Sequence, residues 1–292
     1  MELQAIQRSR LRKLTLAASL AAVYTIFRAT PISRLIGISG SITAAGMVAP
    51  VIGILLEPSY GIVAVFTGTM IASLLPWNPL IFGGLDFLPG AVNVALVSLV
   101  VRGRRTEATL MFLMGIGLFI LNPYTTLFVG RALLSPPIPY LWMHLAALIV
   151  LVSPLSKNLG TRLSLSRPEP KVTSATATWK NIRAWPKLLH AAVLLNKSLG
   201  GAIAILAFTG TMIEHLAGGI LYASIFGSRF PILWSVIFLA YPVERTVIVV
   251  GAILICTPLL LRLSESVIGR SFEVRTKPVT STSVDAMESG KS

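Results

Sequence analysis

The sequence predicts an all-α membrane protein, a polytopic bundle of about eight transmembrane helices with both termini in the cytoplasm. Of the 292 residues, 54% are hydrophobic and only 12% are charged, against roughly 25% charged residues in soluble domains. Charges are sparse in several stretches of about 15 to 28 residues, a length that crosses the hydrocarbon core of a bilayer. The composition therefore excludes an ordinary soluble enzyme and predicts a multi-pass protein of the cell membrane.

The predicted membrane spans are the apolar stretches, taken in order along the chain. They are Leu14 to Phe27, Ile42 to Leu56, Gly61 to Leu75, Gly90 to Val101, Ala108 to Leu121, Tyr140 to Val152, Leu199 to Phe226 and Val243 to Leu263. Proline-containing breaks are expected on the outer side at residues 76–79 and 122–123. The segment Ile232 to Ala240 is apolar but too short to cross, and Pro231 and Pro242 bracket it. We therefore expect an outer re-entrant segment there.

The distribution of positive charge gives the orientation. Cytoplasmic segments carry an excess of Lys and Arg in membrane proteins. With the N-terminus inside, the Lys and Arg residues that fall outside are Arg28, Arg34, Arg131, Arg229 and Arg245. A net charge of +14 would suggest nucleic acid in a soluble protein, but the lipid bilayer accounts for it better here. We expect no nucleic-acid partner.

The chain divides into two membrane parts and two polar segments. Residues 1–152 form a first membrane half of about six helices, and 153–198 form a basic cytoplasmic linker rich in Ser, Thr and Pro. Residues 199–263 form a second half of about two helices plus the re-entrant segment, and 264–292 form a disordered cytoplasmic tail. A single cysteine, Cys256, and three histidines isolated in different segments predict no metal site.

The first predicted helix carries two rows of small residues, Ala17 with Ala21 and Ala18 with Ala22. In lipid, small residues four apart let helix backbones approach closely. This double row is wider than one neighbouring helix would fill. We therefore expect a partner subunit to dock on it.

Polar residues near the outer ends of spans are candidates for substrate binding, because such groups are costly in a membrane. The candidates are Asn93, Glu214, His215, Trp234 and Tyr241. Amide and carboxylate groups can orient the polar edge of a solute, and aromatic rings can stack on it. Glu244 and Arg245 suit the start of a helix at the water interface, with ligand contact as the alternative.

These features resemble the substrate-binding S components of energy-coupling factor transporters. A basic start precedes the A-x-x-x-A helix at Arg12 to Tyr24, and a short helix rich in small residues follows at Ser39 to Leu56. Glu57-Pro58-Ser59-Tyr60-Gly61 matches that family's Gly-Pro-x-x-Gly turn except that Glu57 replaces the first Gly. The ending, Glu214 to Gly219 and Tyr241 to Leu259, is also similar. The chain departs in size, because it inserts about two helices, roughly Ala108 to Val152, into the usual six.

The resemblance implies a subunit that captures a small, vitamin-like, water-soluble nutrient from outside and is not itself an enzyme. The family docks through its A-x-x-x-A face on a membrane coupling subunit carried by two ATPase subunits. Docking is thereby assigned to Ala18 and Ala22, with Ala17 and Ala21 beside them. Consistently, the chain has no G-x-x-x-x-G-K-[ST] phosphate loop, and we expect no cofactor.

We expect the loop that carries Ser39, Ser41 and Thr43 to gate an outer substrate pocket. Two alternatives remain open. Ser39 in Gly-Ile-Ser-Gly and His215 in His-Leu-Ala-Gly resemble the serine and histidine elements of rhomboid intramembrane proteases, in which the histidine activates the serine. Against this, no H-x-x-x-N oxyanion element precedes them. The other alternative is a membrane scaffold that binds no substrate.

Overall fold

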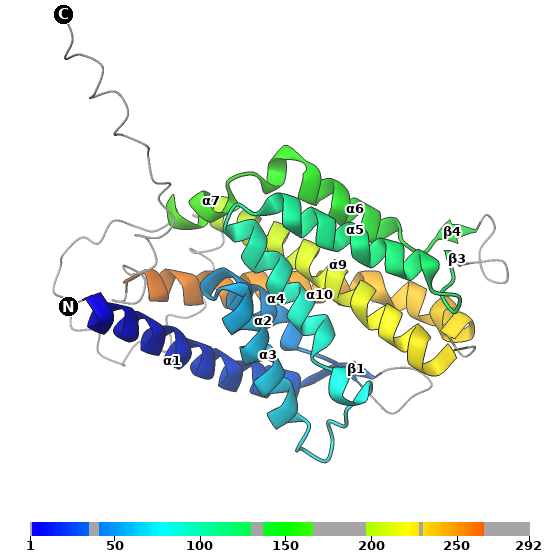
Figure 1. Ribbon diagram of the computed structural model, residues 1–292. Coiled ribbons are helices and arrows are strands. Elements are labelled where there is room, and N and C mark those ends of the chain that lie inside the picture. The colour runs from blue at the N-terminus through cyan, green and yellow to red at the C-terminus, as the bar shows by residue number, and fades with distance from the viewer. Residues whose placement is uncertain (1, 35–40, 130–136, 166–196, 228–229, 266–292) are drawn as a thin grey trace, which may run out of the picture.

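The computed structural model describes residues 2–34, 41–129, 137–165, 197–227 and 230–265, and these residues are mostly helical (Figure 1). The helices are α1 (Glu2–Arg28), α2 (Ala45–Leu55), α3 (Pro58–Ala72), α4 (Leu88–Val101), α5 (Arg105–Leu121), α6 (Trp142–Val152), α7 (Leu159–Leu165), α9 (Lys197–Phe226) and α10 (Phe230–Glu265). Single 3₁₀ turns form at η1 (Gly83–Leu85) and η2 (Pro154–Ser156). The predicted helical class is confirmed.

Two short antiparallel hairpins among the described residues were not predicted. In one, β1 (Pro31–Arg34) pairs with β2 (Ser41–Thr43). In the other, β3 (Phe128–Val129) pairs with β4 (Ile138–Pro139). Strands of two to four residues leave no periodic pattern long enough to separate them from loops in the sequence.

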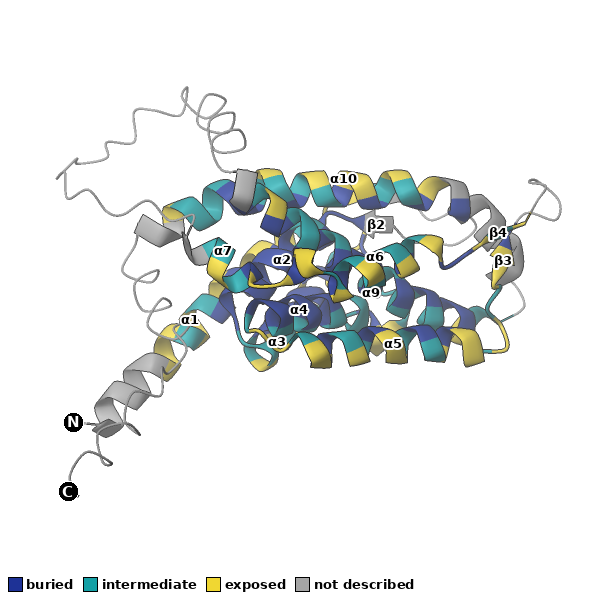
Figure 2. Cartoon of the chain, turned by 90° about the horizontal axis from the view of Figure 1, so that it is seen from above, coloured by how far each residue is buried: buried dark blue, intermediate teal, exposed yellow. Residues whose placement is uncertain are grey.

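Within the described part of the chain, three helical stretches are long and apolar enough to cross a membrane. They are Gly83–Val101, Leu199–Phe226 and Ala240–Arg262, while α2, α3 and α6 are apolar but shorter. Large apolar side chains are exposed along the outer faces of α5 and α10, whereas α2 and α4 are mostly buried (Figure 2). Exposed apolar surface on this scale is typical of a protein that faces lipid, so the chain associates with a membrane.

The predicted re-entrant segment at Ile232 to Ala240 is wrong. Helix α10 runs without a break from Phe230 to Glu265 and contains both Pro242 and Pro258. Pro242 lacks the N–H that would bond the carbonyl group four residues earlier, but packed neighbouring helices let a membrane helix tolerate that loss. The prolines therefore lie inside one long helix.

Other boundaries follow local chemistry. The proline-rich segment 76–79 is non-helical, as predicted, and Asn78 Nδ2 donates to the Ala72 carbonyl at the end of α3, at 3.2 Å. Helix α3 starts at Pro58, where a missing N–H costs nothing.

The predicted linker begins with folded structure, because Leu159 of α7 is buried on the bundle. Residues 166–196 and the tail after 265 lie outside the described residues.

Helix α9 lies at the centre of the bundle, with α2, α4, α5, α6, α7 and α10 around it. On one face of α9, the side chains of Leu199, Ile203 and Ala207 pack against a cluster of buried apolar residues from α1, α2 and α3. On another face of α9, Leu206 and Ile213 are among the side chains that pack against a second buried apolar cluster, from α4, α5 and α6. Polar residues on α9 are therefore surrounded by protein on several sides.

The single cysteine lies on the contact between α10 and α2. Cys256 is fully buried, and its sulfur lies 3.7 Å from the carbonyl oxygen of Met47. Next to this contact, Gly251 of α10 lies against the Met47 side chain, where a Cβ would come within 2.9 Å of its Cγ and Cε atoms. Close packing therefore holds these two helices together.

Candidate binding site in the bundle core

The centre of the site is a hydrogen bond between α4 and α9. Asn93 Nδ2 donates to Glu214 Oε2 at 2.6 Å. Oε2 also faces α2, because a Cβ at Gly46 would lie 3.5 Å from it. Glu214 lies deep within the bundle yet keeps part of its side chain accessible. Asn93 is fully buried, and its Oδ1 lies against Gly210 with no hydrogen-bond partner.

Rings from three elements stack beside this hydrogen bond. His215 Nδ1 lies 3.2 Å from His144 Nε2, and His215 Nε2 lies 3.3 Å from the Tyr140 hydroxyl oxygen. The Tyr241 ring stacks on the His215 ring, with centroids 4.9 Å apart and an interplanar angle of 14°. Because a hydrogen bond between two imidazoles needs one nitrogen without a proton, at most one of these two histidines is charged.

A buried cation completes the site from α10. Arg245 lies one turn after Tyr241 and is 5% exposed. Its Nη1 donates to the Thr211 hydroxyl at 3.0 Å, while its Nε is buried without a partner. No ion pair joins Arg245 to Glu214 among the described residues. The expectation that Glu244 and Arg245 start a helix at the water interface is wrong, because α10 begins at Phe230.

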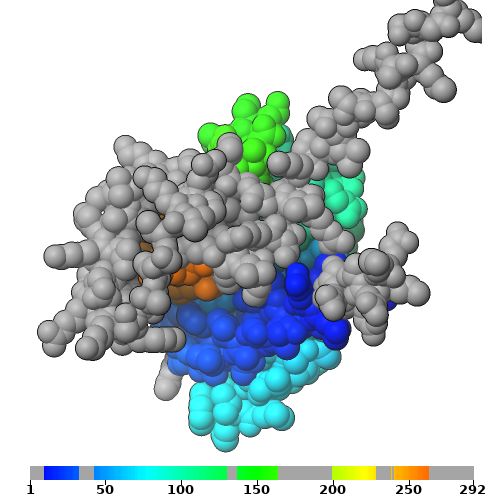
Figure 3. All heavy atoms as spheres, turned by 90° about the vertical axis from the view of Figure 1, so that its left-hand side faces the viewer, coloured from blue at the N-terminus to red at the C-terminus, as the bar shows by residue number. Residues whose placement is uncertain are grey.

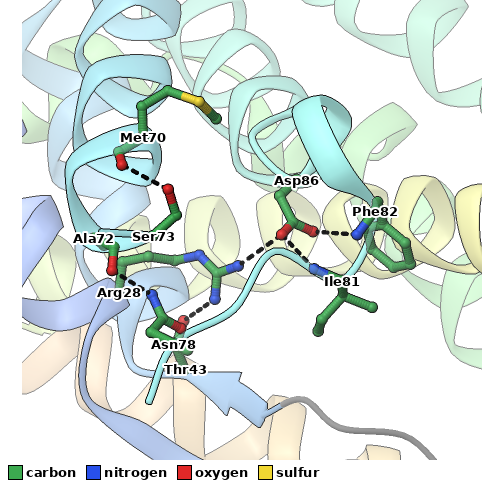
Figure 4. Close-up of polar contacts among 9 residues, drawn as sticks. All are labelled: Arg28, Thr43, Met70, Ala72, Ser73, Asn78, Ile81, Phe82 and Asp86. Atoms are coloured by element: carbon green, nitrogen blue, oxygen red, sulfur yellow. Dashed lines mark hydrogen bonds and ion pairs between the residues drawn. The ribbon is translucent and has the colours of Figure 1, made fainter. Parts of the chain in front are cut away.

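A second polar group ties α1 to the segment before α4 (Figure 4). Arg28 Nη2 lies 3.7 Å from Asp86 Oδ2, and Arg28 Nη1 donates to the Thr43 hydroxyl at 3.5 Å. Asp86 also accepts from the backbone N–H groups of Ile81, at 2.6 Å, and Phe82, at 3.0 Å. We call Arg28, Thr43 and Asp86 the clasp. From the sequence, Arg28 was expected only as a charge on the outer side, and Asp86 was not predicted.

Four of the five predicted ligand residues meet in the core, from three helices. They are Asn93 of α4, Glu214 and His215 of α9, and Tyr241 of α10. The side chain of the fifth, Trp234, lies outside the described residues.

The predicted gating residues are only partly described. Thr43 is buried in the clasp. Ser39 and the side chain of Ser41 lie outside the described residues. The position of Thr43 beside Arg28 links the end of this loop to α1.

Sequence reasoning missed three residues of the core site. Tyr140 and Thr211 carry common polar groups that the sequence does not distinguish from others. His144 was expected to be isolated, which is wrong, because it lies 3.2 Å from His215. Its place in an apolar stretch was a usable signal, since ionisable groups in membrane helices mark functional sites. In the described part of the chain, no group of three or more His, Cys, Asp or Glu side chains is arranged to hold a metal ion.

The two alanine rows of α1 point in different directions. Ala17 and Ala21 are buried, and α1 packs along α3 so closely that a Cβ at Gly68 would lie 2.9 Å from the Ala21 carbonyl oxygen. Ala18 and Ala22 are exposed. Of the predicted docking residues, the second row is therefore the one open to another protein.

Comparison with known proteins gives no relative from which a role can be transferred. No family model matches the chain, and neither a curated protein nor a solved structure matches it. The function must therefore be argued from the geometry of the site.

Proposed function

We propose that this protein is a membrane-embedded capture subunit that binds a small water-soluble, vitamin-like nutrient from outside the cell, for uptake energised by partner ATPases. The observation that supports this proposal is the convergence of Asn93, Glu214, His215 and Tyr241 inside an apolar bundle. Asn93 Oδ1 is buried there without a hydrogen-bond partner, and such an atom is costly in apolar surroundings. A solute that supplies complementary groups recovers that cost on binding.

The proposed topology has eight helices crossing the cell membrane and both termini in the cytoplasm. The charges of the described residues support it. Lys13 pairs with Glu57 at 2.9 Å, and Arg105 donates to the Val152 carbonyl. Lys13 lies on α1, Arg105 starts α5 and Val152 ends α6. Figure 3 views the end of the bundle where α1 and α7 are seen together. An excess of Lys and Arg at one end is what the positive-inside rule requires of the cytoplasmic side.

In this topology the clasp lies on the outer side. Movement of Thr43 away from α1 would break its 3.5 Å contact with Arg28. We propose that this loop, with Ser39 and Ser41, controls entry of the solute to the core site.

Replacing Glu214 with Gln is expected to abolish retention of the solute that the wild-type protein binds, because the amide presents an N–H where the carboxylate accepts one. The measurement is native mass spectrometry of the gently solubilised protein from its own membranes. Wild-type protein should carry a small-molecule adduct that Glu214→Gln lacks. Glu107→Gln is the matched control, because Glu107 pairs with Arg104 in an exposed position. The wild-type adduct persisting on Glu214→Gln, or a bare wild-type chain, contradicts the proposal.

Docking of the coupling subunit is proposed on the exposed row of α1. Replacing Ala18 and Ala22 by Trp should abolish co-purification of a membrane coupling subunit with its two ATPase subunits while leaving the adduct in place, because bulky side chains prevent close helix approach. Leu118→Trp is the control, since Leu118 is an exposed apolar residue on α5. Retained co-purification in the Ala18/Ala22 variant would remove the docking assignment.

The geometry argues against a rhomboid-like protease. Both ring nitrogens of His215 have a neighbour at hydrogen-bonding distance, His144 on one side and Tyr140 on the other. A histidine that activates Ser39 needs one ring nitrogen available to that hydroxyl. The histidine therefore fits a binding site better than a catalytic pair.

A further inference from the structure

We infer that the core site selects a zwitterionic solute, one that carries both an anionic group and a protonated amine. This inference rests on the proposed capture function and names the chemical class of its substrate. The residues that carry it are Glu214 and Arg245, which bring opposite charges into one apolar bundle.

The two charges are not neutralised by contact with each other. Glu214 accepts a hydrogen bond from the Asn93 amide at 2.6 Å, and Arg245 donates one to the Thr211 hydroxyl at 3.0 Å. Both partners are uncharged, and no ion pair links Glu214 to Arg245 within the described ranges. A charge without a counter-ion in surroundings of low dielectric constant is unfavourable. Each of these charges therefore gains from a ligand group of opposite sign.

Each charge also keeps an unused hydrogen-bonding atom. Arg245 Nε is a donor that is buried without an acceptor. Glu214 Oε1 accepts no hydrogen bond from a described residue, and the Glu214 side chain keeps accessible surface. A ligand carboxylate can accept a hydrogen bond from Arg245 Nε, and a ligand ammonium group can donate one to Glu214 Oε1. Hydrogen bonds between charged partners are stronger than those between neutral ones.

The charge balance favours a zwitterion over a singly charged solute. Glu214 and Arg245 cancel, so a zwitterion adds no net charge to the bundle and pairs both groups. A solute with one charge pairs one of them and leaves the other without a counter-ion, which is how binding sites reject wrong ligands. Arg28, a further cation of the bundle, is paired with Asp86 and therefore adds no unpaired charge.

The test is adduct formation measured by native mass spectrometry with purified full-length protein and a defined panel. The panel contains the standard amino acids and glycine betaine, the matching carboxylic acids without the amine, the matching amines without the carboxylate, and uncharged sugars. Wild-type protein should retain zwitterions at least about 30-fold better than either singly charged class, the loss expected when one partner of a buried charge pair is missing.

Two variants should reverse the selectivity in opposite directions. Arg245→Met leaves only the negative charge and should favour amines, whereas Glu214→Gln leaves only the positive charge and should favour carboxylic acids. The exposed pair supplies the matched controls, Arg104→Met and Glu107→Gln, which should keep the wild-type preference. If Arg245→Met does not fold, Arg245→Lys keeps the charge and should keep the preference for zwitterions.

The outcomes separate this inference from the proposed function. Retention of singly charged or uncharged members alone, or variants without the opposite shifts, would overturn the zwitterion assignment and leave capture of a solute intact. A wild-type chain that retains no panel member also overturns the assignment. The adduct on protein from its own membranes then decides the capture function separately.

Discussion

Replacing Asp86 with Ala is expected to lower the free energy of unfolding by about 3 to 5 kcal/mol, the usual cost of removing one partner of a buried ion pair. The side chain of Asp86 is 1% exposed and that of its partner Arg28 is 11% exposed. The substitution leaves the guanidinium without its counter-ion and the N–H groups of Ile81 and Phe82 without an acceptor. Denaturation in mixed micelles measures the change.

A matched ion pair at the other end of the bundle provides the control. Arg104 and Glu107 lie 3.0 Å apart, and both side chains are about half exposed. Glu107→Ala should therefore cost no more than about 1 kcal/mol. Replacing Arg28 and Asp86 together by Met and Leu should cost less than Asp86→Ala alone, because no buried charge then remains unpaired. Equal losses for Asp86→Ala and Glu107→Ala would mean that the clasp is solvated.

Gly210→Ala is expected to destabilise the protein by about 3 kcal/mol, as overpacking of a tight core does, and to abolish solute binding. A Cβ at this position would overlap Asn93 Oδ1 and come within 3.0 Å of Asn93 Cγ and of Val97 Cγ2. Asn93 is fully buried, so its side chain cannot move into solvent. Its displacement breaks the 2.6 Å hydrogen bond to Glu214. Thermal unfolding and adduct formation measure the two effects.

The same helix offers a control for this substitution. A Cβ at Gly201 of α9 would meet no atom within 4 Å. Gly201→Ala should therefore leave binding unchanged and stabilise α9 by up to about 1 kcal/mol, because Ala is the better helix former. If Gly210→Ala binds solute as well as Gly201→Ala does, the contact between Asn93 and Gly210 is not required by the site.

The sequence predicts the helices better than it predicts their ends. Runs of apolar residues locate α2 to α6 and α9 because lipid and core both demand apolar side chains. The end of α10 nearest Phe230 could not be predicted, because Pro242 reads as a helix breaker in isolation. Only the neighbouring helices of the folded bundle compensate for the backbone hydrogen bond that Pro242 cannot make.

A residue of the site could be predicted where its own type, in its place along the chain, marks it as functional. Asn93 and Glu214 stand out because polar groups are rare in apolar spans. Arg245 was predicted to lie at a helix start because Pro242 was expected to break the helix just before it. The contact of His144 with His215 depends on how α6 packs against α9, and no spacing along the chain reveals it. The ion pair of Arg28 with Asp86 is hidden for the same reason.

The burial of Cys256 gives the unmodified protein an internal reporter of opening. It is the single cysteine in the sequence, and it is covered where α10 meets Met47 of α2. A covered thiol reacts with maleimide only after the surrounding structure opens. The labelling rate of wild-type protein therefore measures how often α10 separates from α2, and a solute that binds between α9 and α10 should slow that rate.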